Sequence, residues 1–323
     1  MERYIITAIA LAIPAYFYTW LVRTIDRFEK EPVLYLIAAF LWGAVPAVVF
    51  ALVLQLVFSV PVNQIFGQET LQGQLIEAAV SAPVTEEILK GMAVAIVYLR
   101  HRREFDGWVD GIVYGATAGF GFAYVENIIY LTSTQTWQDW GALFFLRAIV
   151  FGGMHGFWSA LVGIGFGFAR YSSDPLKKVL AIACGLMAAI SGHLIHNGAI
   201  TLIEKTSGLT LIVALFNYAA LGLLMVVLWF VAGYVEHQRL RTYLREEVPD
   251  FISPECYEAL CKHRSDTLAA LGMSLYQRRA LFQVAAELAQ KKLQLSKMGE
   301  EEGNSRQIAH LRQELRRLGR QRI

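Results

Sequence analysis

Charged residues are scarce in this sequence. Asp, Glu, Lys and Arg make up 17% of its 323 residues, against about 25% in an ordinary soluble domain. Hydrophobic residues make up 55%. A water-soluble fold could not keep so much apolar surface from water with so few charges. The composition therefore excludes that class and predicts a membrane protein.

Cysteine is also scarce. The three cysteines are Cys184, Cys256 and Cys261, and their odd number and spacing match neither a disulfide framework nor a zinc motif. A recognisable signal-peptide cleavage site is missing too. The first apolar run extends to about residue 22 without a small-residue cleavage site, so we expect a retained first span.

The charges that are present are unevenly distributed. Residues 1–235 carry 13 Lys and Arg and 15 Asp and Glu, whereas the shorter segment 236–323 carries 16 and 12. We therefore predict a membrane domain over 1–235 and a solvated tail over 236–323. The tail's basic surplus favours anionic lipid headgroups over nucleic acid, because no compact basic motif accompanies it.

Seven apolar runs are long enough to cross a lipid bilayer, which takes about 20 residues. They lie near residues 4–22, 33–60, 75–99, 109–133, 141–169, 179–203 and 209–235. Such runs are too long for the strands of a membrane barrel. The predicted fold is an all-α, polytopic membrane helix bundle of about seven spans, followed by a helical tail.

The positively charged loops favour one orientation. Lys and Arg cluster after the first, third, fifth and seventh runs, while the opposite side has little more than Arg3 and Lys205. Because positively charged loops stay in the cytoplasm, we predict an external N-terminus and a cytoplasmic tail.

Small residues indicate which spans pack closely. Gly111, Gly115 and Gly119 recur every four residues in the fourth run, and Gly152 and Gly156 do so in the fifth. Stripes of this kind let helix backbones approach each other in lipid, so we expect the fourth and fifth spans to pack tightly.

The tail has the leucine pattern of a helix. A polar break over residues 299–304 separates this stripe from a second, short helix. The leucines of the predicted stripe are Leu268, Leu271, Leu275, Leu281, Leu288 and Leu295.

The third run contains ionisable residues near its middle, where each costs about 2.5–3.5 kcal/mol. Glu86 and Lys90 are four residues apart on one helix face, and Glu87 is also within reach of Lys90. A self-neutralised ion pair would leave the second carboxylate unmatched. Pro83, one turn earlier, removes a backbone hydrogen bond and should kink or loosen the helix.

The next three runs place further polar residues at a similar depth. Because successive spans alternate in direction, each depth can be estimated independently, and all fall in the middle to outer half of the bilayer. One common site is the simplest explanation. The residues are Glu126, His155, His193, His196 and Asn197.

Two chemistries fit such a cluster. In the first, His and Glu ligate Zn²⁺ and a remaining Glu acts as general base on the bound water. In the second, a glutamate activates water without a metal, while His and Asn donate hydrogen bonds to the oxyanion. The sequence lacks a His-Glu-x-x-His motif, a convincing serine nucleophile and a phosphate-binding loop.

Four motifs on successive runs resemble those of the PrsW family of intramembrane proteases, within the wider superfamily that includes the prenyl-protein (CAAX) endoproteases. The motifs are Glu86-Glu87-x-x-Lys90, Phe122-x-x-x-Glu126, His155 alone, and His193-x-x-x-Asn197.

The resemblance implies cleavage of a peptide bond within or near the membrane. The implied substrate is a membrane-anchored regulatory protein such as an anti-sigma factor, and the implied location is a bacterial inner membrane. By the same resemblance Glu86 is the water-activating base, with Glu87 as the second choice, and Lys90 balances their charge.

The resemblance also gives roles to the remaining residues. Glu126 and His155 would position water or bind metal, and His193 and Asn197 would stabilise the oxyanion, unless His193 is a ligand. His196 lies outside the family pattern. A zinc site would draw on Glu126, His155, His193 and His196.

Two functions without catalysis compete with this interpretation. One is a scaffold subunit of a larger membrane complex, which would have no need for Glu86, Glu87 and His193 together. The other is an ion or solute transporter, which typically has matching broken helices in two repeats, and the sequence shows no such duplication.

Overall fold

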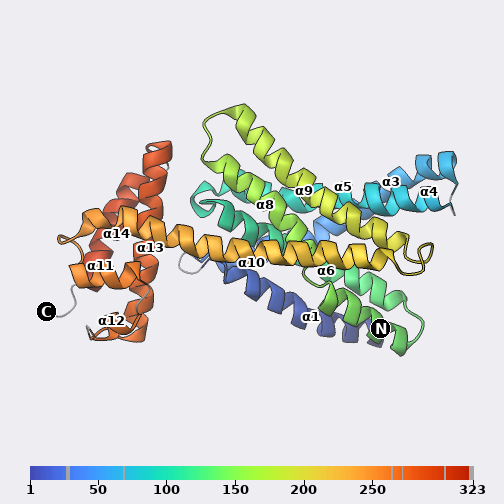
Figure 1. The fold of residues 1–323 in the computed structure, drawn as a ribbon, viewed down its shortest axis with the longest axis horizontal. Coiled ribbons are helices and arrows are strands. Elements are labelled where there is room, and N and C mark those ends of the chain that lie inside the picture. Colours follow the sequence, from blue (N-terminus) through green and yellow to red (C-terminus); the bar gives the residue numbers. More distant parts are fainter. Residues whose placement is uncertain (27–29, 68–69, 263–264, 271, 302, 320–323) are drawn as a thin grey trace. The chain divides into compact units, whose positions relative to one another are not determined.

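The computed structural model describes residues 1–26, 30–67, 70–262, 265–270, 272–301 and 303–319. All regular elements within these ranges are helices, as predicted (Figure 1). The chain divides into two compact units. The first comprises Met1–Ile25 and Glu31–Val227, and the second comprises Asp26–Lys30 and the residues from Leu228 onward, so one boundary falls inside α10 (Thr210–Tyr243).

The first unit holds the helices of the first six predicted runs and the beginning of α10, which contains the seventh. Figure 1 shows α8 and α9 of this unit side by side. The helices that precede α10 are α1 (Glu2–Arg23), α2 (Val33–Trp42), α3 (Val48–Phe66), α4 (Leu71–Leu75), α5 (Ala82–Arg100), α6 (Trp108–Ser133), α7 (Trp137–Phe144), α8 (Met154–Arg170) and α9 (Pro175–Thr201).

Three of the runs contain a short π-helical stretch, in which backbone hydrogen bonds join residues that are five positions apart. These stretches join α2 to α3, join α4 to α5, and follow α7. They are η1 (Gly43–Ala47), η2 (Ile76–Ser81) and η4 (Phe145–Val150). A 3₁₀ turn, η3 (Arg102–Glu104), follows α5.

Five helical stretches within the described residues are long and apolar enough to cross a membrane. They are Glu2–Arg23, Val33–Phe66, Trp137–Arg170, Pro175–Thr201 and Thr210–Glu247. The other two predicted runs, α5 and α6, are helical as well. They carry ionisable residues, glycines and polar side chains that are largely buried against other helices. The count of seven spans stays a prediction.

The helix before the two glutamates is loosened at Pro83, as predicted. The Ala82 N–H donates to the carbonyl of Glu77, five residues back, instead of to that of Ala78. Pro83 has no N–H to offer the Ala78 carbonyl. The side chain of Asn197 on α9 supplies the missing donor, with Nδ2 2.8 Å from the Ala78 oxygen.

Helix α6 packs closely on α8, which confirms the expectation from its glycine stripe. A Cβ atom at Gly115 would lie 2.3 Å from the carbonyl oxygen of Ser159, and one at Gly119 would lie 2.2 Å from that of His155. Gly111 faces the α8 backbone in the same way. The two backbones can approach this closely only because the stripe has no side chains.

The second unit is built from the end of α10 and the tail. Its core contains Leu240, Leu260, Leu281, Leu288 and Leu311. Its remaining elements are η5 (Arg245–Glu247), α11 (Pro254–Cys261), α12 (Ser265–Ala270), α13 (Leu275–Met298) and α14 (Asn304–Gly319).

The predicted leucine stripe does not form one helix. Leu268 belongs to α12, and Leu271 lies outside the described residues. Gly272, at φ +81°, has a backbone conformation that a helix does not use. Ser274 then caps α13 through a reciprocal pair of hydrogen bonds with Gln277. Local capping therefore overrides the leucine spacing. The second helix expected after the polar break is present as α14.

The cysteines are free thiols. Cys184 is exposed on α9, whereas Cys256 and Cys261 are buried in α11. Burial, together with the neighbouring charge of Glu255, raises the pKa of the Cys256 thiol to about 11. This thiol therefore stays protonated near neutral pH.

The close α6–α8 packing can be tested at Gly115. The Gly115→Val substitution places carbon atoms where the Ser159 carbonyl lies, so we expect a loss of about 1–3 kcal/mol in the free energy of unfolding. Thermal unfolding of the purified protein in detergent measures it. Gly141→Val is the control, because a Cβ at Gly141 meets no atom within 4 Å. Equal unfolding temperatures for the two variants would contradict the packing.

Candidate functional site

The predicted site residues of three helices meet in one buried cluster. Glu86, Glu87 and Lys90 come from α5, His155 from α8 and His193 from α9. Each is at most 9% exposed. The structure therefore brings together residues that are more than 100 positions apart in the sequence.

Glu87 lies at the centre of the cluster and uses both of its oxygens. Its Oε1 accepts from Lys90 Nζ at 2.5 Å and from His193 Nδ1 at 2.9 Å. Its Oε2 accepts from Ser159 Oγ at 3.2 Å. This carboxylate is completely buried. Both oxygens thus accept hydrogen bonds from protein donors.

Glu86 differs from its neighbour because one of its oxygens accepts no hydrogen bond from the described residues. Its Oε1 accepts from Gln55 Nε2 of α3 at 3.1 Å. Its Oε2 is buried, but no hydrogen bond reaches it among the described residues. Lys90 Nζ and His193 Nε2 both lie 3.9 Å from it. The Glu86 carboxylate can therefore take a further ligand, such as a water molecule.

The ring of His155 is held from two sides. Lys90 Nζ lies 3.1 Å from Nδ1, and Glu126 Oε2 lies 3.0 Å from Nε2. A lysine ammonium can only donate, so Nδ1 accepts the hydrogen bond and we infer that Nε2–H donates to Glu126. His155 is thus linked to α5 and to α6.

Glu126 lies at the edge of the cluster and is half-buried. Besides His155, it binds the guanidinium of Arg147, whose Nη2 is 2.5 Å from Oε2. Arg147 was not singled out from the sequence. The signal was available, since Arg147 is an ionisable residue inside the fifth predicted run.

His196 and Asn197 lie beside the cluster. The His196 ring packs against Phe151 and Trp158, and its buried Nδ1 has no hydrogen-bond partner among the described residues. Asn197 is bonded to the Ala78 carbonyl. Trp158 also stacks on His193, with ring centroids 3.9 Å apart. No motif or spacing pointed to Trp158, Ser159 or Gln55.

Three cluster residues could hold a metal ion. One ligand atom each from Glu86, His155 and His193 lie within 4.8 Å of one another. One carboxylate oxygen and two imidazole nitrogens suit a divalent ion such as Zn²⁺. The group contains two members of the predicted set, with Glu86 in place of Glu126 and His196. The unpaired Glu86 oxygen fits such an ion.

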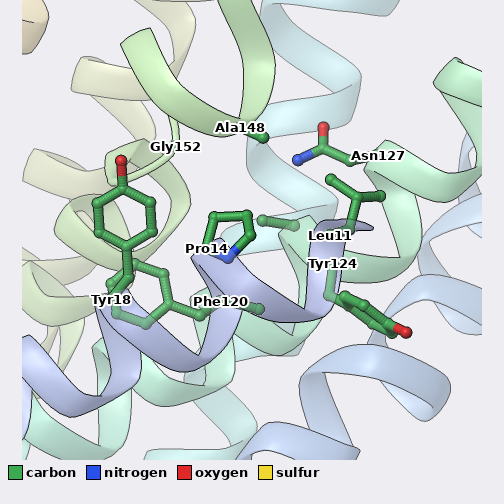
Figure 2. Close-up of a pocket in the computed structure, with 10 residues that line it drawn as sticks. Leu11, Pro14, Tyr18, Phe120, Tyr124, Asn127, Ala148 and Gly152 are labelled. Carbon is green, nitrogen blue, oxygen red and sulfur yellow. The ribbon is translucent and has the colours of Figure 1, made fainter. Parts of the chain in front are cut away.

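A separate pocket lies between α1, α6 and the segment that follows α7 (Figure 2). Its walls are mostly apolar, and none of the candidate site residues lines it. Among the residues labelled in Figure 2 are Leu11, Pro14, Tyr18, Phe120, Tyr124 and Asn127. Asn127 is the sequence neighbour of Glu126 and also accepts from Arg147.

Comparison with known proteins agrees with these motifs. Residues 31–233, which include all four of them, match the model of the PrsW family of intramembrane metalloproteases. The chain belongs to this family. It is 30% identical to Protease PrsW of Oceanobacillus iheyensis over 63% of its length and 82% of that protein. It is also 30% identical to Protease PrsW of Bacillus subtilis, over 52% of its length and 68% of that protein. No solved structure matches.

Membership of the PrsW family makes this chain a membrane-embedded peptidase that acts on a protein substrate. The scaffold and transporter alternatives are not favoured. The matches concern the PrsW family, so the placement in the wider CAAX superfamily stays a prediction.

Proposed function

We propose that the buried cluster of α5, α8 and α9 is the hydrolytic centre of this protease and that Glu86 handles the water. One observation carries the proposal. Of the two adjacent carboxylates, Glu87 accepts hydrogen bonds on both oxygens, whereas Glu86 keeps one buried oxygen without a hydrogen bond among the described residues. A buried polar atom without a partner is rare and marks a place for a ligand.

Glu87 and Lys90 position the other groups in this proposal. The Glu87 carboxylate fixes the Nδ1–H of His193, which leaves His193 Nε2 as a lone pair facing Glu86. Lys90 neutralises the Glu87 charge and also holds His155. Neither residue needs to touch the substrate to be required for activity.

Asn197 has a different role from the one that the resemblance implies. Its amide nitrogen donates to the Ala78 carbonyl, which Pro83 leaves without a helical donor. This contact supports a role in fixing η2, and hence the start of α5, instead of a direct contact with the oxyanion.

A divalent ion, with Zn²⁺ as the first choice, would be held by Glu86, His155 and His193. When bound, such an ion lowers the pKa of its water and polarises the substrate carbonyl. His155 would take part through Nδ1, because its Nε2 donates to Glu126, and the ion would replace the Lys90 ammonium as the partner of that nitrogen. Glu86 thus has a role in both chemistries. Without a metal it is the base that activates the water, and with a metal it is a ligand of the ion that would bind the water.

The substrate that we propose is a membrane-anchored protein of the anti-sigma-factor kind, which the family resemblance implies. The position of the cluster supports cleavage at membrane depth. Glu86 is buried and lies next to the completely buried Glu87, so the scissile bond has to reach Glu86 inside the bundle.

The expected orientation places the tail in the cytoplasm and the protein in a bacterial inner membrane. The distribution of Lys and Arg between alternate loops supports it. In right-side-out vesicles, external protease should spare a tag attached at the C-terminus. Digestion of that tag from outside would overturn the orientation.

The two glutamates should respond differently to the same substitution. Glu86→Gln should fold normally and lose cleavage of a single-span reporter substrate by at least about 100-fold, because the water-handling group is gone. Glu87→Gln is the matched control. It leaves the Lys90 charge without its partner, which costs about 3–5 kcal/mol, so its main defect should be in thermal unfolding. A folded Glu86→Gln protein that cleaves at the wild-type rate would disprove the proposal.

The hypothesis of a bound metal predicts about one divalent ion per chain in the purified, chelator-washed protein. His193→Ala should lose most of that ion, because it removes one of three protein ligands. Elemental analysis of both proteins measures this. Full activity with far less than one ion per chain would exclude the metal and leave Glu86 acting on water directly.

A further inference from the structure

Arg147 stands out because no motif includes it and because it lies in a segment apolar enough to cross the membrane. It belongs to η4, and its guanidinium binds two consecutive residues of α6. Nη2 is 2.5 Å from Glu126 Oε2, and Nε is 2.6 Å from Asn127 Oδ1. The guanidinium carbon also lies 3.9 Å from the centre of the Tyr130 ring. A charge at such a place is usually functional.

The helix containing Arg147 is interrupted immediately before the cluster. The π-helical stretch η4 ends at Val150, and α8 begins at Met154, so residues 151–153 form a turn. His155 is the second residue of α8. Arg147 and His155 therefore lie on opposite sides of this break.

Both residues bind the same oxygen. Glu126 Oε2 is 2.5 Å from Arg147 Nη2 and 3.0 Å from His155 Nε2. The contacts continue from His155 Nδ1 to Lys90 Nζ, and from there to Glu87. The Glu126 carboxylate on Nε2 and the Lys90 ammonium on Nδ1 therefore together determine that Nδ1 is the acceptor of the His155 ring.

We propose that Arg147 is a positioning residue of the hydrolytic centre, which holds Glu126 so that this carboxylate fixes the tautomer and orientation of His155. Glu126 then acts as the outer partner of the histidine and not as a metal ligand. A carboxylate that accepts the second N–H of a histidine is a common arrangement around such centres. The inference rests on the proposed function.

The guanidinium suits this task better than an ammonium group would. It presents several N–H groups in one plane, so Arg147 can hold Glu126 and Asn127 together. The Asn127 contact fixes the guanidinium on α6, and the Tyr130 ring covers its face. A lysine at this position would keep the charge but lose one of the two anchoring contacts.

The first experiment separates positioning from folding and from substrate binding. Cleavage of a single-span reporter is measured for wild type, Arg147→Gln, Arg147→Lys and the control Arg3→Gln. Arg3 is a comparable anchor, which joins α1 to Thr134 away from the cluster. We expect Arg147→Gln to lower kcat at least about 10-fold with KM within about twofold, and Arg147→Lys to recover part of kcat. Arg3→Gln should affect thermal unfolding but not kcat.

The second experiment does not depend on cleavage. In full-length protein labelled with ¹⁵N-histidine, the side-chain signals of His155, assigned with His155→Gln, should show a protonated Nε2 in wild type at neutral pH. In Arg147→Gln we expect a mixture of tautomers. This readout remains valid if the wild-type protein cleaves no reporter, so a failure of the proposed function and a failure of this inference are distinguishable.

Three outcomes would overturn the inference. An unchanged His155 spectrum in Arg147→Gln would show that Arg147 does not act on this ring. A higher KM with an unchanged kcat would make Arg147 a substrate-binding residue. A loss of kcat that merely follows the loss of thermal stability, as judged against Arg3→Gln, would leave Arg147 a structural ion pair.

Discussion

The arrangement of the membrane unit depends on the pairing of charges that have been taken out of water. Lys90 and Glu87 are completely buried, and their side chains are 2.5 Å apart. An unpaired charge at such a place costs several kcal/mol. Lys90 also contacts His155, and Glu87 contacts His193, so the two members of this ion pair join α8 and α9 to α5.

Close backbone packing makes this pairing geometrically possible. The glycine stripe of α6 lets α8 approach until the position of Gly119 nearly touches the His155 carbonyl. That approach brings His155 within reach of Glu126 on the same helix α6. Because lipid chains are as apolar as the helix surfaces, packing of small residues, and not hydrophobic burial, drives such contacts in a membrane.

The π-helical stretches and the break before α8 help to position the polar groups of the site. The π-helical stretch before α5 leaves the Ala78 carbonyl free for Asn197. Arg147 and His155, which precede and follow the break before α8, both bind the same oxygen of Glu126. Single-turn π-helical insertions are frequent at functional sites. Here they allow one helix to present groups in directions that a regular helix would not offer.

Residue patterns alone predict the helical class, the helix-rich apolar segment and the close packing of α6 on α8, because the length of hydrophobic runs and the spacing of glycines are local properties of the chain. The sequence also predicts the ionisable members of the cluster. Ionisable residues are costly in lipid, and their depth can be estimated because successive spans run in opposite directions. Contacts between helices are what make Glu87 accept hydrogen bonds on both oxygens while, within the described part of the chain, Glu86 keeps one oxygen without any. Glu86 and Glu87 are adjacent, and what distinguishes them comes from Gln55, Ser159 and His193 on other helices. The tertiary structure also decided the place of Arg147, and it divided the leucine stripe of the tail at Gly272. These features depend on contacts between distant segments or on backbone geometry, neither of which residue spacing records.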